Sequence, residues 1–313
     1  MKAIVVPTFT NPPTLRYEEV PKPQIAADEV LVRVQATSVN PVDTYICTGA
    51  AQSWLNLKLP LIPGADFAGV VEAVGSDVKD VKPGEEVYSY SPLQRLGAFA
   101  EYLAVPAAIV APKPPNLSFE EAASLPIVAL TAWQSLFEAA QLKAGQKVLI
   151  HAAAGGVGTM AVQLAKAHGA YVYGTASTGN IPFLKELGVD APIDYTSTPF
   201  EQVAKEVDVV FDMVGGETLM RSLQTLKPGG CLVSIVGGSA NPDVAKEAEK
   251  RGVRYVYVLV RPDRAQLQHL NELIAAGKLR PIIAKRYALE QAGEALAQVA
   301  TRHTRGKVVM HVP

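Results

Sequence analysis

The spacing of apolar residues divides the chain into two parts of different texture. Over about the first 115 residues, short runs rich in valine and aromatic residues alternate with turns that contain Pro and Gly, as in KAIVV, DEVLVRVQATSV, DFAGVVEAVG, EEVYSY and FAEYLAV. β-Branched and aromatic residues favour strands, and the scattered prolines disfavour long helices. The sequence therefore predicts a mostly β domain at the start of the chain.

Helical spacing begins near Ser118, which is followed three residues later by Glu121 in the order of a capping box. From Lys147, the strand-like runs KVLIHA, YVYGTA, VDVVFDMVG and CLVSIVG are separated by helical patterns. Buried parallel strands joined by crossover helices give this rhythm, so we predict an α/β doubly wound parallel sheet. Residues 262–279 and 289–303 are amphipathic helix candidates, and 306–312 form a closing strand.

Composition excludes several classes of protein. The chain has 313 residues, is 49% hydrophobic and 19% charged, and carries a formal net charge of -1, so two folded domains are expected and neither nucleic acid nor membrane is expected as a main partner. Two distant cysteines cannot form a disulfide framework, and the first residues lack the apolar core of a signal peptide. A cytoplasmic protein is the expectation.

The stretch VLIHAAAGGVGTMAVQLAKAHGA places a glycine cluster between a strand and a helix. The positions of the dinucleotide fingerprint hold Ala153, Gly155 and Gly158, with Gly156 and Val157 between the last two. Such a turn can serve helix packing alone. Its place in a strand–turn–helix unit favours a phosphate cradle, with Gly155, Gly156 and Val157 as cofactor-binding residues.

The end of the next strand indicates which nucleotide is bound. Sites that prefer NAD carry Asp or Glu there for the ribose 2′-hydroxyl. Here the position is Ser177, followed by Thr178, Gly179 and Asn180, and the nearest basic residue is Lys185. A carboxylate would repel a 2′-phosphate, so Ser177 favours NADPH.

Several motifs occur in one order along nearly the whole chain: VNPVDTY, IPGADFAGVVEAVG, GAFAEY, LTAWQSL, AAAGGVG, KPGG and TRGKVV. In this the chain resembles the medium-chain dehydrogenase/reductase superfamily, and within it the zinc-free quinone oxidoreductase (ζ-crystallin-like) and alkenal/enone reductase branch. The resemblance implies a GroES-like mostly β domain from residues 1–122 and 262–313, and a Rossmann NADPH-binding domain from 123–261.

The resemblance also allows a test for zinc. The metal-dependent members use a Cys and a His at positions that hold Asn40 and Ala65 here, and their structural zinc needs four clustered cysteines. This chain has two cysteines and five dispersed histidines, so no metal site is expected. Carbonyl reduction usually needs a Lewis acid, whereas quinones and enones are already electron-poor. The expected substrate is therefore a small quinone or enone.

In the resembling family, the residue that matches Asn40 lies near the nicotinamide, and the tyrosine that matches Tyr45 lines the substrate cleft. Asn40 precedes Pro41 and can also cap a helix. Tyr45 can orient substrate or donate a proton, or it can be a half-buried aromatic. Asp43 is expected to hold this loop.

The remaining candidates also come from the resemblance. Thr131 matches a residue near the nicotinamide and Tyr195 a tyrosine beside the adenosine 2′-phosphate, although either side chain can be structural. Val236 and Gly237 follow a strand of the parallel sheet, where nucleotides bind. The basic residues of TRGKVV, Arg305 and Lys307, are expected either near the cofactor phosphates or in solvent.

Two other readings of the function stay open. One is a 2-alkenal or enone double-bond reductase with little quinone activity, and the other is a non-catalytic, crystallin-like NADPH-binding protein. Residues 253–259 (VRYVYVL) form a late strand rich in valine and tyrosine. As a sheet edge this strand invites pairing, and the resembling family dimerises through the region, so a homodimer is expected.

Overall fold

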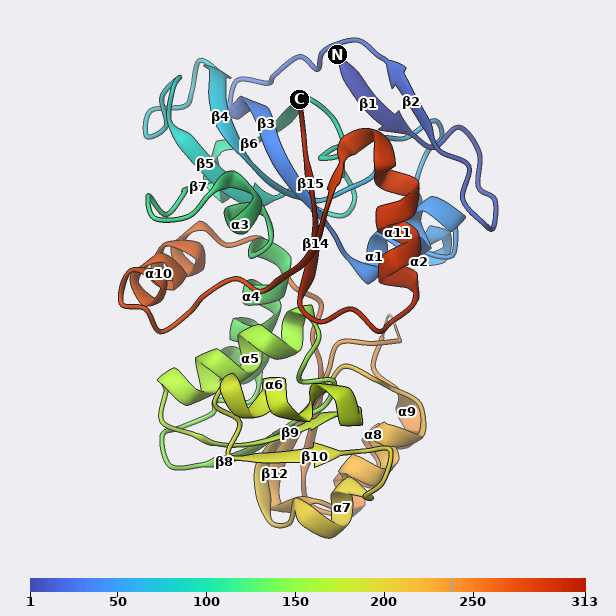
Figure 1. Ribbon diagram of the computed structural model, residues 1–313, viewed down its shortest axis with the longest axis vertical. Helices are drawn as coiled ribbons and strands as arrows, with labels where there is room; N and C mark the ends of the chain where they lie inside the picture. The colour runs from blue at the N-terminus through green and yellow to red at the C-terminus, as the bar shows by residue number, and fades with distance from the viewer. Residues whose placement is uncertain (238) are drawn as a thin grey trace. The chain divides into compact units, whose positions relative to one another are not determined.

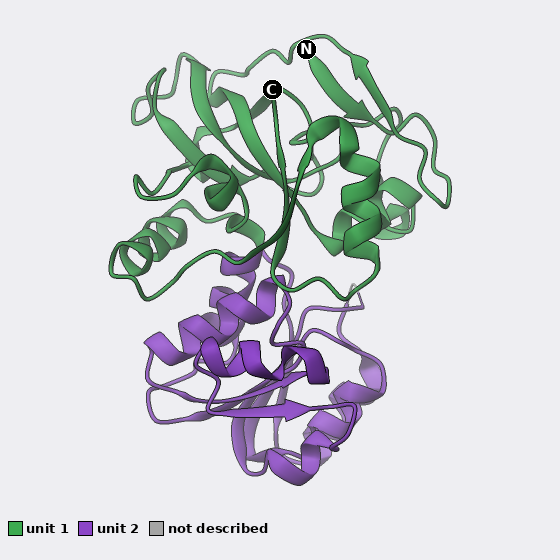
Figure 2. Ribbon diagram, in the orientation of Figure 1, with its two compact units in different colours: residues 1–127, 261–313 green, residues 128–260 purple. Residues whose placement is uncertain are grey.

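The computed structural model describes residues 1–237 and 239–313, and it consists of two compact units (Figure 2). One unit comprises residues 1–127 with 261–313, and the other comprises residues 128–260. The sequence analysis placed these divisions at 122/123 and 261/262. The C-terminal segment therefore shares a unit with the N-terminal part of the chain.

The first unit is built on a seven-stranded sheet with the order β14-β15-β3-β4-β5-β7, in which β6 also pairs with β3. A separate two-stranded sheet joins β1 and β2. All pairs are antiparallel except β14 with β15. The strands are β1 (Lys2–Val5), β2 (Arg16–Glu19), β3 (Glu29–Val39), β4 (Asp66–Val74), β5 (Glu86–Tyr90), β6 (Tyr102–Pro106), β7 (Ala111–Pro112), β14 (Ile283–Ala288) and β15 (Lys307–His311).

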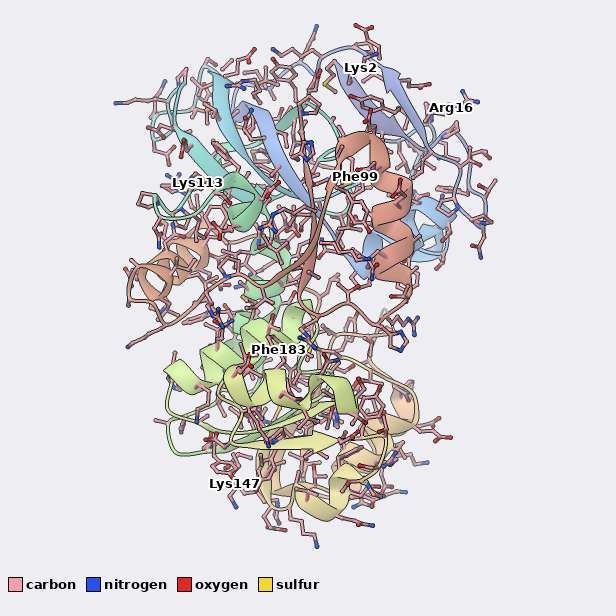
Figure 3. All side chains as sticks on the ribbon, viewed as in Figure 1. Lys2, Arg16, Phe99, Lys113, Lys147 and Phe183 are labelled. Carbon is pink, nitrogen blue, oxygen red and sulfur yellow. The ribbon has the colours of Figure 1, made fainter. Side chains whose placement is uncertain are left out.

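Short helices complete this unit: α1 (Pro41–Thr48), α2 (Gln52–Leu55), α3 (Phe119–Ala123), α10 (Arg264–Ala275), α11 (Ala292–Ala300), and the 3₁₀ turns η1 (Ala107–Ile109) and η4 (Leu289–Gln291). Helix α11 packs on α1 and β15, so the C-terminal segment lies against the N-terminal part of the chain (Figure 1). Phe99, labelled in Figure 3, is fully buried in the same core as the apolar face of α11. The predicted β domain, its closing strand and the capping box at Ser118 are confirmed.

The second unit contains a wholly parallel six-stranded sheet. Its strands are β8 (Lys147–Ile150), β9 (Tyr171–Ala176), β10 (Ala191–Asp194), β11 (Val207–Asp212), β12 (Leu226–Ser234) and β13 (Arg254–Tyr257), in the order β10-β9-β8-β11-β12-β13. Numbered from the first strand, this is the order 3-2-1-4-5-6 of a Rossmann fold. The chain reverses its winding between β8 and β11, and nucleotides bind beyond the carboxyl ends of strands at such a point.

The helices of the second unit are α4 (Pro126–Trp133), the π-helical η2 (Gln134–Ala139), α5 (Gly156–Ala167), η3 (Thr178–Asn180), α6 (Ile181–Glu186), α7 (Phe200–Val203), α8 (Glu217–Ser222) and α9 (Pro242–Lys250). The first two residues of α4 belong to the first unit. Strand β13 is an edge, as predicted, although it is shorter than the predicted seven-residue run. Among residues 1–237 and 239–313, no helix has the length and apolar character needed to span a membrane.

Candidate functional site

The glycine turn joins the end of β8 to the start of α5. Its backbone enters the left-handed region at Ala152 (φ 48°), not at Ala153, which occupies the first fingerprint position. Alanine at position 153 is therefore accommodated with ordinary backbone angles, and the strain falls one residue earlier.

Gly158 is required by packing. A Cβ at this position would lie 2.3 Å from the carbonyl oxygen of Ala152 and 2.7 Å from Cα of Ala153. A Cβ at Gly155, the N-cap of α5, would meet only the same carbonyl oxygen, at 3.3 Å. The helix can thus begin directly against the turn. Its first N–H groups have no partners inside the helix and, with the helix dipole, they form a cradle suited to an anionic phosphate.

The ends of β9 and β10 bring Ser177 and Tyr195 to one edge of the sheet. The strands pair in parallel with Asp194 opposite Ala176, and the N–H of Tyr195 donates to the carbonyl oxygen of Ala176 at 3.2 Å. Asn180 Nδ2 donates to Ser177 Oγ at 3.3 Å. The side chain of Tyr195 is 55% exposed, so it is available to a ligand at this edge.

Asp194 is a carboxylate at this edge that the sequence analysis did not identify. Its Oδ1 accepts hydrogen bonds from Thr196 N at 3.0 Å and Thr196 Oγ1 at 2.6 Å. The hydroxyl of Thr178 and these two donors hold the pKa of Asp194 below its usual value. The negative charge of Asp194 is therefore partly balanced by hydrogen-bond donors near it. Ser177 itself carries no charge.

The loops that follow β11 and β12 pack together. Asp212, the last residue of β11, is fully buried, and its Oδ1 accepts from the N–H of Val214 at 3.0 Å and of Gly215 at 2.7 Å. A Cβ at Gly215 would lie 2.9 Å from Val236 Cγ2, and Gly237 has a φ of 93°. Val236 thus lies beside the loop that follows β11. The anchoring role of Asp212 was missed, because only the fold pairs it with the N–H groups of its own loop.

Other candidates in this unit are buried. His151 lies between Thr175 Oγ1 (3.2 Å from Nδ1) and Ser222 Oγ (3.0 Å from Nε2), and burial lowers its pKa to about 3. It is therefore a neutral hydrogen-bonding residue of the core. Thr131 is also buried, on α4.

The first unit holds a buried charged cluster where β3, β4 and β15 meet α1. Lys307 Nζ donates to Asn40 Oδ1 at 2.5 Å and to the carbonyl oxygen of Val39 at 3.1 Å, and lies 3.3 Å from Asp66 Oδ2. Asn40 Nδ2 donates to Asp66 Oδ2 at 2.8 Å, and Asn40 N donates to Asp43 Oδ2 at 2.7 Å. Both polar atoms of the Asn40 amide are therefore engaged inside the protein.

Lys307 does not face solvent, which was one of the two positions expected for the basic residues of TRGKVV. It is 5% exposed, and burial lowers its pKa. Its position follows from the antiparallel register of Val308 with Val39, which places Lys307 beside Asn40. Burial raises the pKa of Asp43 to about 7.

Helix α1 presents Tyr45 to the surface. The side chain is 42% exposed, and its Oη accepts a hydrogen bond from Arg302 Nη2 at 3.0 Å. Cys47, on the same helix, is buried, and burial raises the pKa of its thiol. Asn40 and Tyr45 thus lie at the start and on the exposed face of one helix, with Asp43 holding the loop as expected.

Both parts of the chain match known protein families, and its relatives cover nearly its whole length. One family model, described as an alcohol dehydrogenase GroES-like domain, matches residues 26–115, and another, described as a zinc-binding dehydrogenase, matches residues 187–310. A 2-methylene-furan-3-one reductase of Solanum lycopersicum is 38% identical over 327 residues, covering 99% of this chain and 79% of that protein.

Two further similarities bear on chemistry. A chloroplastic NADPH-dependent alkenal/one oxidoreductase of Arabidopsis thaliana is 35% identical, covering 99% of this chain and 79% of that protein. The structure of the quinone oxidoreductase from Coxiella burnetii superposes with a TM-score of 0.95 at 36% identity, covering 100% of this chain and 99% of that one.

Proposed function

Because this chain belongs to the medium-chain dehydrogenase/reductase superfamily, in the branch of quinone and alkenal reductases, we propose that it is an NADPH-dependent, zinc-independent reductase of quinones and other electrophilic acceptors. Membership of this branch makes the protein an oxidoreductase enzyme. We further infer that it reduces quinones or enones and needs no zinc.

The observation that carries the cofactor assignment is the pairing of the phosphate cradle with Ser177. Gly158 lets α5 begin against the turn, which directs N–H groups at a phosphate. At the end of β9, Ser177 offers a hydroxyl group where an NAD site would carry a carboxylate. Tyr195 adds a hydroxyl group from the end of β10, beside Asp194, whose carboxylate accepts hydrogen bonds from Thr196. These groups fit the pyrophosphate and the 2′-phosphate of NADPH.

The bound dihydronicotinamide would supply the hydride, and the chain must supply orientation and a proton. Tyr45 carries an exposed hydroxyl that already accepts a hydrogen bond from Arg302, so its own proton can be donated outward. We assign Tyr45 the role of proton donor to the reduced acceptor, with an ordered water as the other source. Thr131 and the backbone of Gly155, Gly156, Val157, Val236 and Gly237 are assigned to cofactor binding.

Zinc independence is supported by the charges beside Asn40. This residue matches the position of a metal-binding Cys in the zinc enzymes, and here its Oδ1 lies 2.5 Å from the Lys307 ammonium. A divalent cation beside a buried ammonium would be strongly disfavoured. Among the described residues, no group of three or more His, Cys, Asp or Glu side chains is placed to hold a metal ion.

The acceptor class divides into quinones and enones, and specific similarities favour each. The Coxiella burnetii protein is named for quinone, whereas the two plant relatives are named for enone-type substrates. Without a metal to polarise an isolated carbonyl, both classes share the electron-poor carbon or oxygen that such a site needs.

The test combines binding and turnover. Purified protein is titrated with NADPH and with NADH, and the NADPH complex is then mixed by stopped flow with 1,4-benzoquinone and, separately, with a 2-alkenal. We expect tighter binding of NADPH and rapid oxidation by at least one acceptor, and the faster acceptor identifies the class. Tight binding without oxidation by any acceptor would instead support a crystallin-like binding protein.

The proposal extends to location and assembly. Both cysteines are buried and free, which suits a reducing compartment such as the cytoplasm. Strand β13 ends the parallel sheet, so an equivalent strand of a second copy can pair with it and form a homodimer.

A further inference from the structure

Three charged side chains are buried together in the first unit. Asp43 and Asp66 are fully buried and Lys307 is 5% exposed, so one ammonium faces two carboxylates. Buried charges persist only when they are paired and hydrogen-bonded, because each is costly to remove from water. The cluster therefore constrains the groups that it contacts.

Its charge pattern fixes the orientation of the Asn40 amide. The oxygen of that amide accepts from the Lys307 ammonium, while its nitrogen donates to the Asp66 carboxylate. A flipped amide would direct its nitrogen at the ammonium and its oxygen at the carboxylate. Both contacts would then be repulsive, so a single orientation is allowed.

The same residue connects the cluster to α1. The backbone N–H of Asn40 donates to Asp43 Oδ2, which belongs to the first turn of the helix, and Tyr45 follows two residues later on that helix. Asp43 Oδ1 has no hydrogen-bond partner among the described residues. The helix has only eight residues, so the position of its first turn sets the position of Tyr45.

We propose that Lys307 is a positioning residue for the reaction: its ammonium fixes Asn40 and, through Asn40 and Asp43, the start of α1, and so holds Tyr45 in place. This inference rests on the proposed function. It assigns a task to a buried lysine whose ammonium contacts Asn40, the carbonyl oxygen of Val39 and Asp66. A purely structural ion pair would stabilise the same fold without affecting how the reaction depends on pH.

The distinction follows from the charge environment of Asp43. Lys307 on β15 favours the ionised form of its carboxyl group, and Asp66 on β4 disfavours it. Cys47 on α1 also adjoins Asp43, but its thiol is neutral because burial raises its pKa. The one ionisable side chain of the packed helix α11, Glu294, is exposed.

Ionised Asp43 is the stronger acceptor for the N–H of Asn40. Removing the Lys307 charge must raise the pKa of Asp43. On acidification Asp43 then takes up its proton, and the first turn of α1 loosens, at a higher pH than in wild type. Removing the Asp66 charge must lower the pKa of Asp43 and shift that transition the other way. Opposite shifts from two partners of one ion pair are not expected from loss of stability alone.

The experiment compares Lys307→Met, Asp66→Asn and the double variant with wild type. Lys113→Met is the matched control, because the Lys113 side chain is also largely covered and its ammonium pairs with a carboxylate, that of the exposed Glu86, in the same unit. Lys113 is labelled in Figure 3. The pKa of Asp43 is measured on the cofactor-free proteins by NMR of 13Cγ-labelled aspartate, assigned with Asp43→Asn. The pH profile of single-turnover NADPH oxidation and the Kd for NADPH are measured on the same variants.

We expect the Asp43 pKa and the acidic limb of the activity profile to rise together in Lys307→Met and to fall together in Asp66→Asn. At pH 7, Lys307→Met should lose about ten- to hundredfold in rate, as a misplaced catalytic group does, while Kd for NADPH stays within about twofold. Lys113→Met should match wild type. If Lys307→Met does not fold, Asp66→Asn and the double variant, which removes both charges of the pair, carry the same comparison.

Two outcomes overturn the inference. In the first, the Asp43 pKa moves while the activity profile stays where it is in wild type. In the second, the folded variants of Lys307 and Asp66 react as fast as Lys113→Met at every pH. If either result is obtained while wild type is active, the proposed function still stands. If wild type does not oxidise NADPH with any acceptor tested, both the proposed function and this inference are refuted.

Discussion

Replacing Gly158 by alanine tests whether the turn after β8 is a phosphate cradle that depends on close packing. The substitution adds one methyl group to the third residue of α5. That methyl group would lie 2.3 Å from the carbonyl oxygen of Ala152 and 2.7 Å from Cα of Ala153. Both obstructing atoms belong to the backbone, so no side-chain rotation can relieve the overlap.

The geometry sets the size of the effect. Ordinary van der Waals contact begins at 3.4 Å, so the helix and turn must separate by about 1 Å at this point. Overpacking of this kind costs about 1–3 kcal/mol, which lowers Tm by roughly 2–4 °C per kcal/mol for a domain of this size. The same separation moves the N–H groups of α5 away from the phosphate, so NADPH affinity should fall at least tenfold.

The assay measures Tm by calorimetry and Kd for NADPH by titration, for Gly158→Ala and two controls. Gly155→Ala adds a methyl group 3.3 Å from the same carbonyl oxygen, so it should preserve Tm while weakening NADPH binding through crowding of the phosphate. Gly293→Ala makes the same change on α11, with Leu15 Cδ1 at 4.0 Å as its neighbour, and should leave Kd unchanged. A Gly158→Ala protein with wild-type Tm and Kd would refute the packing argument.

Four further outcomes follow from the structure. Ser177→Asp places a carboxylate where the 2′-phosphate is proposed to bind, so Kd for NADPH should rise at least tenfold relative to Kd for NADH; equal changes for both would contradict the assignment. Tyr45→Phe should lower the single-turnover rate and its solvent isotope effect, whereas unchanged turnover would remove Tyr45 as proton donor. Val256→Lys puts a charge on the edge strand β13 and should convert a dimer to a monomer in sedimentation velocity, and a wild-type monomer would contradict pairing at this edge. The pKa of Asp43 in the folded protein, about 7, lies above its ordinary value of 3.8, so this group favours folding at low pH and loses that contribution as the pH rises to 7. The free energy of unfolding of wild type should therefore fall by about 4 kcal/mol between pH 4 and pH 8 relative to Asp43→Asn, as measured by urea unfolding.

Local patterns predicted much of the fold because the relevant signals lie within a few residues of one another. The capping box at Ser118, the strand before the glycine turn and the alternation of the parallel sheet are all of this kind. Strand β10 has four residues and contains Pro192, which weakens its strand pattern, so its pairing with β9 was not evident from the sequence. The proximity of Asp194 to the end of β9 follows from that pairing.

The buried cluster lies beyond such local reasoning. Asn40, Asp66 and Lys307 come from three strand ends or helix starts far apart in sequence, and register between β15 and β3 brings them together. In the sequence, Lys307 is one of many lysines in a polar context. The unbroken apolar run of β15 offered one signal, since Val308, Val309 and Met310 are consecutive apolar residues, and all three are buried together with the adjoining Lys307.

The net charge of this cluster suggests how the site would keep its geometry if, as proposed, the reaction needs no metal ion. A divalent ion would balance both carboxylates, whereas the Lys307 ammonium balances one, so the second negative charge is left on Asp43 or removed by a proton. Burial places that choice near neutral pH, because it raises the pKa of Asp43 to about 7. A lysine thus holds Asn40 in one orientation at the cost of making the start of α1 sensitive to protonation, which a bound metal ion would not do.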